Sequence, residues 1–309
     1  MITRRRALAA GLPSAGWRAA ALPAVAAAVT AAAAHAAAAH AAAPAGQAPG
    51  VERYVRFRVN AAGPLAWGRV DGDSVRVLSA APWAPGVRET GKKQTLAKVK
   101  LAAPIEASKL LAVGLNYKSH IGNRPVPQAP EIFYKPITCL HDPGEPIVIP
   151  AGATNVHYEG EIVFVLGSRL ANGGRHLNRQ QAQEAIYGVT CGNDVSERDW
   201  QNGAQKDLQW WRAKGADTFG PAGPMLVHGV DYSKLLLQTR LNGEVVQKQF
   251  TSDLLFDGPA IVSYLSRYIT LSPGDAIYSG TPGSTKPMKA GDVVEVEIDQ
   301  IGVLRNPVK

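Results

Sequence analysis

The sequence predicts an α+β protein in which strands dominate. Stretches typical of strands outnumber those typical of helices, and the two kinds do not alternate regularly as they do around a doubly wound sheet. No internal repeat and no glycine-rich phosphate loop is present. The chain has 309 residues, of which 46% are hydrophobic, so it can bury a core without disulfides. Its length predicts one or two domains.

Residues 1–45 have the composition of an export leader. Arg4, Arg5 and Arg6 precede an Ala-rich run, and Ala-His-Ala steps that suit a signal peptidase follow it. The TRRRALAAG start is similar to a twin-arginine leader, which predicts export of the folded protein to the periplasm. The alternative is a cytoplasmic protein with a misassigned start codon. The Ala-rich run is short for a bilayer and poor in Leu, Ile and Phe, so no stable membrane span is expected.

The charge and the cysteines exclude two classes of function. The net charge is +8, but four arginines of the first fifty residues, which contain no acid, supply half of it. The remainder is spread without a basic stripe, so no nucleic-acid partner is expected. Cys139 and Cys191 lie in apolar segments at a spacing that fits no zinc or redox motif, and we expect two buried thiols.

Residues 51–104 are predicted to form a small N-terminal β unit and a connector. Three short strands are expected over residues 53–60, 64–70 and 74–80, with a turn at Asp71-Gly72 before the third. The polar, proline-containing stretch 81–94 is predicted to be a connector.

Residues 105–309 are predicted to form the larger domain. Strands are expected over residues 109–117, 187–194, 275–280 and 292–299, and a hairpin over 235–249 around Asn242-Gly243. Two helices are expected: 176–186, which Asn178 and Gln181 open as a capping box, and the amphipathic stretch 257–269.

One further strand, over residues 157–167, carries two carboxylates on the same face. Side chains alternate along a strand, so Glu159 and Glu161 share a face with Val163 and Val165, while the other face is apolar as well. Beyond Glu161 the strand therefore has the pattern of a buried one. Two unpaired buried anions are unfavourable, so either Lys/Arg partners or a divalent cation should accompany them. A solvated strand end is the alternative.

A third acid favours the cation. Asp194 ends another predicted strand, just where the backbone turns. Three carboxylates without a Cys or His pair form an oxygen site that suits Mg²⁺, Mn²⁺ or Ca²⁺ rather than zinc. Three protein ligands leave open positions for water or a chelating substrate. His157 is expected to support a ligand, with a structural histidine as the alternative.

Five ordered segments carry a resemblance to a known family: VGLNYKSH, HYEGEIVFVLG, GNDVSERDWQ, QWWRAKGADTFGPAGP and SGTPG. Together they resemble the motif blocks of the fumarylacetoacetate hydrolase family, over residues 105–309. The resemblance implies a mixed β-sheet roll, or barrel-like sandwich, that forms a homodimer. It also implies a divalent metal, Mg²⁺ or Mn²⁺ with Ca²⁺ as a further candidate, held by Glu159, Glu161 and Asp194.

The resemblance also assigns the rest of a site. Lys214 matches the active-site lysine, which can neutralise excess negative charge and hold a substrate oxyanion. Arg198 and Gln209 match polar positions that line or support the pocket, and either can instead be structural. Thr281 lies in a turn whose hydroxyl and N–H groups can bind a substrate carboxylate, or it serves only the turn geometry. Tyr117, which opens the Y-x-x-H pattern, is expected to contact substrate.

His120 matches the catalytic histidine, a general base for water. Many catalytic members resemble the pattern Y-x-x-H-x-x-E, whose Glu orients the His, but Asn123 stands there in this sequence. No acid occurs between Glu106 and Glu131, and the Pro-rich stretch that follows His120 predicts an ordered lid loop rather than a lid helix. The dyad for hydrolysis is therefore incomplete.

These observations predict a divalent-metal-dependent hydrolase or lyase. Its substrate would be a small 2-oxo acid of the acylpyruvate kind, whose C–C bond breaks through a metal-stabilised enolate. Two alternatives remain open. One is an oxaloacetate-type decarboxylase or keto–enol isomerase, which needs no attacking water. The other is a catalytically weak protein that binds metal and carboxylate.

Overall fold

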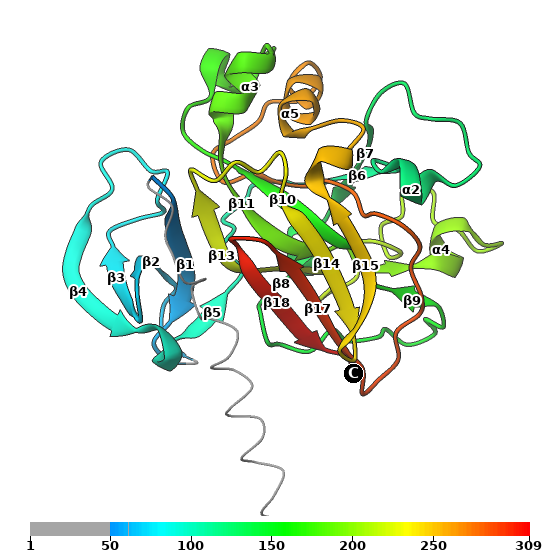
Figure 1. Cartoon of the computed structure of the whole chain (residues 1–309), viewed down its shortest axis with the longest axis horizontal. Coiled ribbons are helices and arrows are strands. Elements are labelled where there is room, and N and C mark those ends of the chain that lie inside the picture. Colours follow the sequence, from blue (N-terminus) through cyan, green and yellow to red (C-terminus); the bar gives the residue numbers. More distant parts are fainter. Residues whose placement is uncertain (1–49, 61) are drawn as a thin grey trace, which may run out of the picture.

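A computed structural model describes residues 50–60 and 62–309, and it confirms the α+β class with a mixed sheet and few helices (Figure 1). The predicted leader, residues 1–45, lies outside the described residues. Most of the regular structure belongs to two sheets, and the helices are short.

The N-terminal unit is an antiparallel meander. It consists of β1 (Glu52–Arg58), β2 (Ala66–Asp71), β3 (Ser74–Leu78) and β4 (Glu89–Thr95), each paired with the next. The short strand β5 (Lys100–Ala102) pairs with the C-terminal part of β1. The predicted connector over residues 81–94 contains the start of β4, a strand that the sequence analysis did not predict. Its side chains are almost all exposed, so the strand has no apolar face that a sequence pattern could reveal.

The main sheet continues through this unit into the rest of the chain. Its strand order is β4-β3-β2-β1-β13-β11-β10-β16-β6-β7, with β8 beside β13. The pairs β16–β6 and β13–β8 are parallel and the others antiparallel. The strands not yet given are β6 (Leu110–Gly114), β7 (Glu131–Lys135), β8 (Leu140–His141), β10 (Gly160–Leu166), β11 (Ile186–Asn193), β13 (Gly220–His228) and β16 (Ala276–Tyr278).

A second, four-stranded antiparallel sheet packs across the middle of the main sheet (Figure 1). Its order is β15-β14-β17-β18, with β14 (Leu236–Leu241), β15 (Glu244–Phe250), β17 (Val293–Ile298) and β18 (Gly302–Pro307). Asn242 and Gly243 connect β14 to β15, both with positive φ, as the sequence predicts for a two-residue hairpin turn. Apolar side chains of both sheets share one core cluster, so the two sheets form a sandwich.

Short helices and 3₁₀ turns complete the fold. The helices α3 (Arg179–Ala185) and α5 (Gly258–Ser266) lie side by side at one end of the sandwich (Figure 1). The capping box of Asn178 and Gln181 at the start of α3 is present as predicted. The remaining elements are α2 (Lys118–Ile121), α4 (Arg198–Asn202), η1 (Leu96–Lys98), η2 (Ile137–Cys139), η3 (Ala171–Gly174), η4 (Thr251–Asp253) and the paired strands β9 (Val156–His157) and β12 (Ser196–Glu197). Both cysteines are buried free thiols.

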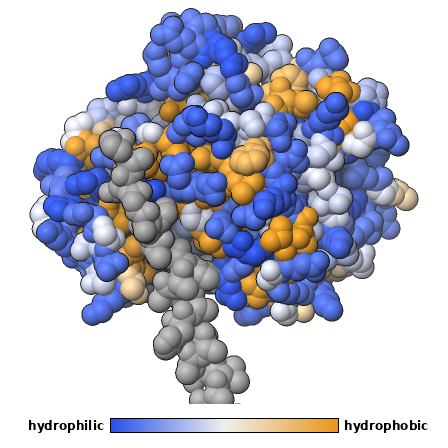
Figure 2. Space-filling model, viewed as in Figure 1, coloured by the Kyte–Doolittle hydropathy of each residue, from blue (hydrophilic) through white to orange (hydrophobic). Residues whose placement is uncertain are grey.

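Hydrophilic residues cover most of the face shown in Figure 2, and apolar residues appear there in separate patches. In the described part of the chain, no helix combines the length and the apolar character that a membrane crossing requires.

Candidate metal centre and its pocket

The strand β10 fixes the position of the two glutamates. All its residues are buried, and its side chains alternate between two core clusters, with Ile162 and Phe164 in one and Val163 and Val165 in the other. At Gly160 a Cβ atom would lie 2.0 Å from Thr239 Oγ1 of β14, so only glycine lets the second sheet approach this closely. The glutamates on either side of Gly160 extend toward the opposite face.

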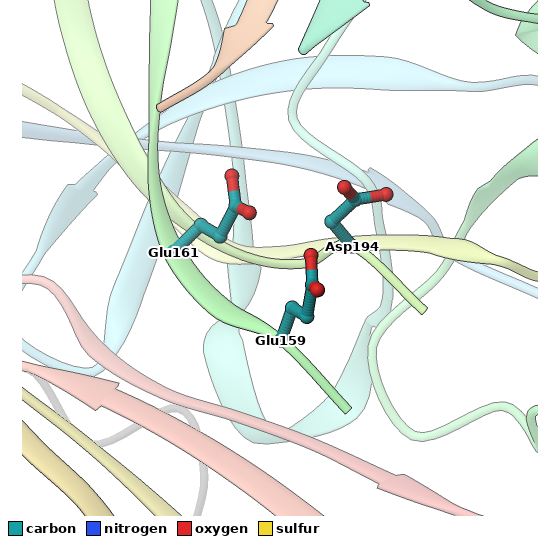
Figure 3. A group of neighbouring side chains, drawn as sticks. All are labelled: Glu159, Glu161 and Asp194. Carbon is teal, nitrogen blue, oxygen red and sulfur yellow. The ribbon is translucent and has the colours of Figure 1, made fainter. Parts of the chain in front are cut away.

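The neighbouring strand β11 brings Asp194 to the same place. Gly160 pairs with Asn193, and the Asp194 N–H donates to the Glu159 carbonyl oxygen at 2.9 Å. The three carboxylates point toward one another (Figure 3), and one oxygen of each lies within 4.8 Å of the others. All three residues are at most 4% exposed.

Three buried or half-buried cations contact this cluster. Lys214 Nζ lies 2.6 Å from Glu159 Oε2 and 2.7 Å from Asp194 Oδ2. Arg198 Nη2 lies 2.5 Å from Glu159 Oε1. Lys135 Nζ lies 2.6 Å from Asp194 Oδ1 and also donates to the carbonyl oxygens of Lys214 and Phe219. Lys135 is the group that the sequence analysis missed, although a lysine at the end of an apolar strand is a signal of a buried ion pair.

Glu161 differs from the other two acids. Among the described residues, its hydrogen-bond donor is the Gly280 N–H, at 2.8 Å from Oε2, and no cation pairs with it. Burial and the charge of Asp194 raise the pKa of Glu161 well above its usual range. Burial acts the same way on Glu159, but Arg198 and Lys214 outweigh it and lower the pKa of that carboxyl. An all-oxygen donor set with one carboxylate that lacks a cation fits a divalent ion, which would supply the missing charge.

A cavity of about 350 Å³ opens beside the cluster. Glu159, His120, Arg198, Lys214 and Thr281 all line it, so the structure brings these five predicted residues together. The remaining wall residues are Val113, Gly114, Leu115, Arg124, Phe133, Gln201, Asn202, Trp210 and Thr285.

His120 lies on the single turn of α2, over the cavity. Its Nδ1 is 2.6 Å from the Gly283 carbonyl oxygen. Because a carbonyl can only accept, Nδ1 carries the proton and Nε2 has the free lone pair. Burial lowers the pKa of His120, although the charge of Glu159 opposes this. Asn123 is exposed, and a backbone carbonyl stands where the resemblance implied an orienting glutamate.

Thr281 lines the cavity, but its hydroxyl is engaged within the protein. It donates to the Gly160 carbonyl oxygen at 2.9 Å and accepts from Gln247 Nε2 at 2.8 Å. These bonds hold the turn against the start of β10, which supports the alternative that Thr281 serves the turn geometry.

Tyr117 and Gln209 are not brought to this cavity. Tyr117 is fully buried at the start of α2, and its hydroxyl has no hydrogen-bond partner among the described residues. Gln209 is exposed and lines a separate surface depression with Leu208 and Trp211. The backbone turns at Trp210, where φ is 54°, so the indole of Trp210 enters the cavity in place of Gln209 and packs edge-on against Phe133.

His157 is linked to the cluster through two other side chains. Its Nδ1 is 2.8 Å from Thr285 Oγ1, which accepts from Arg198, and Arg198 in turn binds Glu159. Burial, together with the charge of Arg198, lowers the pKa of His157 to about 4. This chain of bonds lets His157 hold Arg198 in place without touching a carboxylate of the cluster.

Comparison with protein-family models matches residues 109–309 to the fumarylacetoacetate hydrolase C-terminal domain. The chain belongs to the fumarylacetoacetate hydrolase family. Residues 52–104 match a second family, the Rv2993c-like N-terminal domain. The sequence resemblance and the predicted fold are thereby confirmed.

The relatives in the fumarylacetoacetate hydrolase family are named after several different activities. The chain is 38% identical to the mitochondrial oxaloacetate tautomerase fahd2 of Xenopus laevis, over 68% of each chain. The crystal structure of 2-hydroxyhepta-2,4-diene-1,7-dioate isomerase from Mycobacterium marinum matches with a TM-score of 0.74 at 40% identity, over 83% of this chain and 98% of that one. Maleylpyruvate hydrolase from Sphingobium matches with a TM-score of 0.66 at 27% identity, over 83% and 98%.

Proposed function

We propose that this protein catalyses keto–enol tautomerisation of small 2-oxo acids such as oxaloacetate, with Mg²⁺ or Mn²⁺ at Glu159, Glu161 and Asp194. The observation that carries the proposal is the bond between His120 Nδ1 and the Gly283 carbonyl oxygen. A neutral carbonyl fixes the imidazole tautomer but stabilises the imidazolium less than a carboxylate does. The site thus holds an oriented base of modest strength.

Tautomerisation suits such a base. A divalent ion in the cluster, when bound, polarises the 2-oxo group and makes the neighbouring C–H more acidic. His120 Nε2 takes that proton, solvent water protonates the oxygen of the former carbonyl to give the enol, and the imidazolium returns its proton to the hydroxide left in the solvent. The Lys214 ammonium, held by Glu159 and Asp194, lies at the same wall and stabilises negative charge that develops on the substrate oxygen.

Hydrolysis of a C–C bond is the reaction that the sequence analysis predicted first. It requires a stronger base than tautomerisation does. The imidazole would have to deprotonate a water molecule during attack on a carbonyl, without an orienting carboxylate to stabilise its charge. The names of two relatives above, a tautomerase and an isomerase, support the alternative. The name of a third, a hydrolase at 27% identity, keeps hydrolysis as the second candidate.

The test is a comparison of two reactions on purified protein. Enol-oxaloacetate should ketonise faster with protein and Mg²⁺ than with Mg²⁺ alone, as followed by loss of enol absorbance, and chelation of the metal should remove the acceleration. Acylpyruvates should be hydrolysed much more slowly. Faster hydrolysis than ketonisation would refute the proposal, and binding of metal without turnover of either compound would favour a non-catalytic protein. Light scattering on the same preparation tests the homodimer that the sequence resemblance implies.

A further inference from the structure

Arg124, in the loop that follows α2, faces the cavity that holds the candidate site. The loop fixes this side chain through its backbone. Arg124 Nε donates to the Ile121 carbonyl oxygen at 3.0 Å, and Nη2 donates to the His120 carbonyl oxygen at 3.2 Å. These two bonds hold the guanidinium beside His120 and leave Nη1 free to bind another group.

The charges around the cavity single out Arg124. Among the lining residues His120, Arg124, Arg198 and Lys214 are basic, and Glu159 is the acid. Arg198 and Lys214 both bind Glu159. Across the described residues, 50–60 and 62–309, Arg124 forms no ion pair with a carboxylate. At the mouth of the cavity, Arg124 is therefore an exposed cation that is held in place without a carboxylate partner among the described residues, so it is available to a carboxylate of the ligand.

We infer that Arg124 is a specificity-determining residue that binds the distal carboxylate of a small dicarboxylic 2-oxo acid. The inference rests on the proposed function and narrows its substrate class. The 2-oxo acid end belongs at the carboxylate cluster and Lys214, on the buried wall of the cavity. Arg124 lies on the lid side, and a guanidinium suits a carboxylate because its N–H groups can donate in pairs.

The size and the remaining walls of the cavity limit the ligand. A volume of about 350 Å³ lies at the lower end of the range for small-molecule sites, roughly 300–1,000 Å³. Leu115, Phe133 and Trp210 supply apolar surface in the cavity wall, against which a short carbon chain can pack. A four-carbon dicarboxylic acid meets these conditions better than a monocarboxylic acid with a long acyl chain.

The experiment compares two unreactive probes that differ in the distal carboxylate. Malate and lactate share the 2-hydroxy acid end, and only malate carries the second carboxylate. Their affinities for the Mg²⁺-loaded protein are measured by calorimetry, or by competition against substrate. The wild type should bind malate at least ~10-fold more tightly than lactate. Arg124→Gln should weaken malate binding by about 10- to 100-fold, the typical contribution of a charge-assisted hydrogen bond, and leave lactate binding unchanged.

Two further variants separate charge from structure. Arg124→Lys keeps the charge without the paired donors and should lose part of the preference for malate. Lys118→Gln removes an exposed positive charge from α2, outside the cavity, and should change neither affinity. Equal weakening of both probes in Arg124→Gln would mean that Arg124 only supports the end of α2, and would overturn the inference, as would a wild type without preference for malate. Because neither probe reacts, these outcomes are independent of whether the protein is a tautomerase.

Discussion

The two walls of the cavity are built in different ways. The inner wall is formed by Glu159 and Lys214, which line the cavity, and it is backed by the buried cluster partners Glu161, Asp194 and Lys135. Its lysines, Lys135 and Lys214, are at most 3% exposed. The outer wall consists of His120 on a single helical turn and Arg124 in an exposed loop, both held by hydrogen bonds to backbone carbonyl groups. The inner wall is fixed by sheet register and ion pairs, whereas the outer wall depends on a few bonds to one turn.

This difference suggests a division of tasks. Strands that are buried on both faces cannot change one residue without disturbing the core, so they suit a charge cluster that must keep its geometry. Loops tolerate substitution, so they suit the groups that select a reaction or a substrate. Changes in the inner wall should therefore abolish metal binding or lower stability, and changes in the outer wall should alter the rate or the choice of substrate without unfolding the protein.

The largest effect is expected from Glu161→Gln. The substitution keeps the shape of the side chain and weakens its hydrogen bond from the Gly280 N–H. It also removes the negative charge that binds a divalent ion. Mg²⁺ binding by calorimetry should be lost, and turnover should fall by about three orders of magnitude. Unchanged Mg²⁺ affinity would show that the ion does not bind at these carboxylates. Asp253→Asn, an exposed acid outside the cavity, serves as the matched control.

His120→Gln should lower the tautomerisation rate by about two orders of magnitude, at the lower end of the usual contribution of a general base. The base must be neutral, and burial lowers the pKa of His120, so the wild-type rate should stay high as the pH falls through 6.5 and decline only at lower pH. The variant should lack this acid limb in its pH–rate profile. A wild-type limb above pH 6.5 would contradict the burial of the imidazole.

Lys135→Met tests the inner wall through stability. The fully buried Lys135 ammonium donates to Asp194 and to two carbonyl groups, which would lose their partner. Removal of one partner from a buried ion pair typically costs about 3–5 kcal/mol. Urea unfolding of the metal-free protein should show this loss, while Lys118→Met on the exposed side of α2 should stay within ~0.5 kcal/mol of the wild type. A loss below ~1 kcal/mol would mean that water replaces the ammonium.

The smallest effect is expected from Asn123→Glu. His120 Nδ1 is already bound to the Gly283 carbonyl oxygen, so a new carboxylate has to displace that bond before it can assist the imidazole. Tautomerisation should change by less than about 3-fold, and any hydrolysis of acylpyruvates should rise, by at most about 10-fold. Slower hydrolysis in Asn123→Glu than in the wild type would show that the carbonyl is the better partner.

The sequence predicted the inner wall better than the outer one, for a physical reason. Glu159 and Glu161 stand out because charged residues are rare in a strand with two apolar faces, and their presence alone indicates a compensating group. Lys135 compensates Asp194 from a strand distant in the sequence, and no local pattern connects the two. On the side of the cavity away from the sheet, the sequence predicted Gln209 as a substrate contact, but Trp210 lines the cavity instead. A single residue with positive φ, Trp210, determines which of the two side chains points inward.

The bond between His120 and Gly283 joins opposite sides of the cavity, since α2 carries the imidazole and the turn after β16 carries the carbonyl. The Gly283 N–H also donates to Ser119 Oγ, so the same turn holds two neighbouring residues of α2. If α2 moved away from this turn, the imidazole would lose the group that fixes its tautomer, and Arg124 would leave with it. The tautomer of the base and the position of Arg124 therefore both depend on one contact, the one between α2 and the turn after β16.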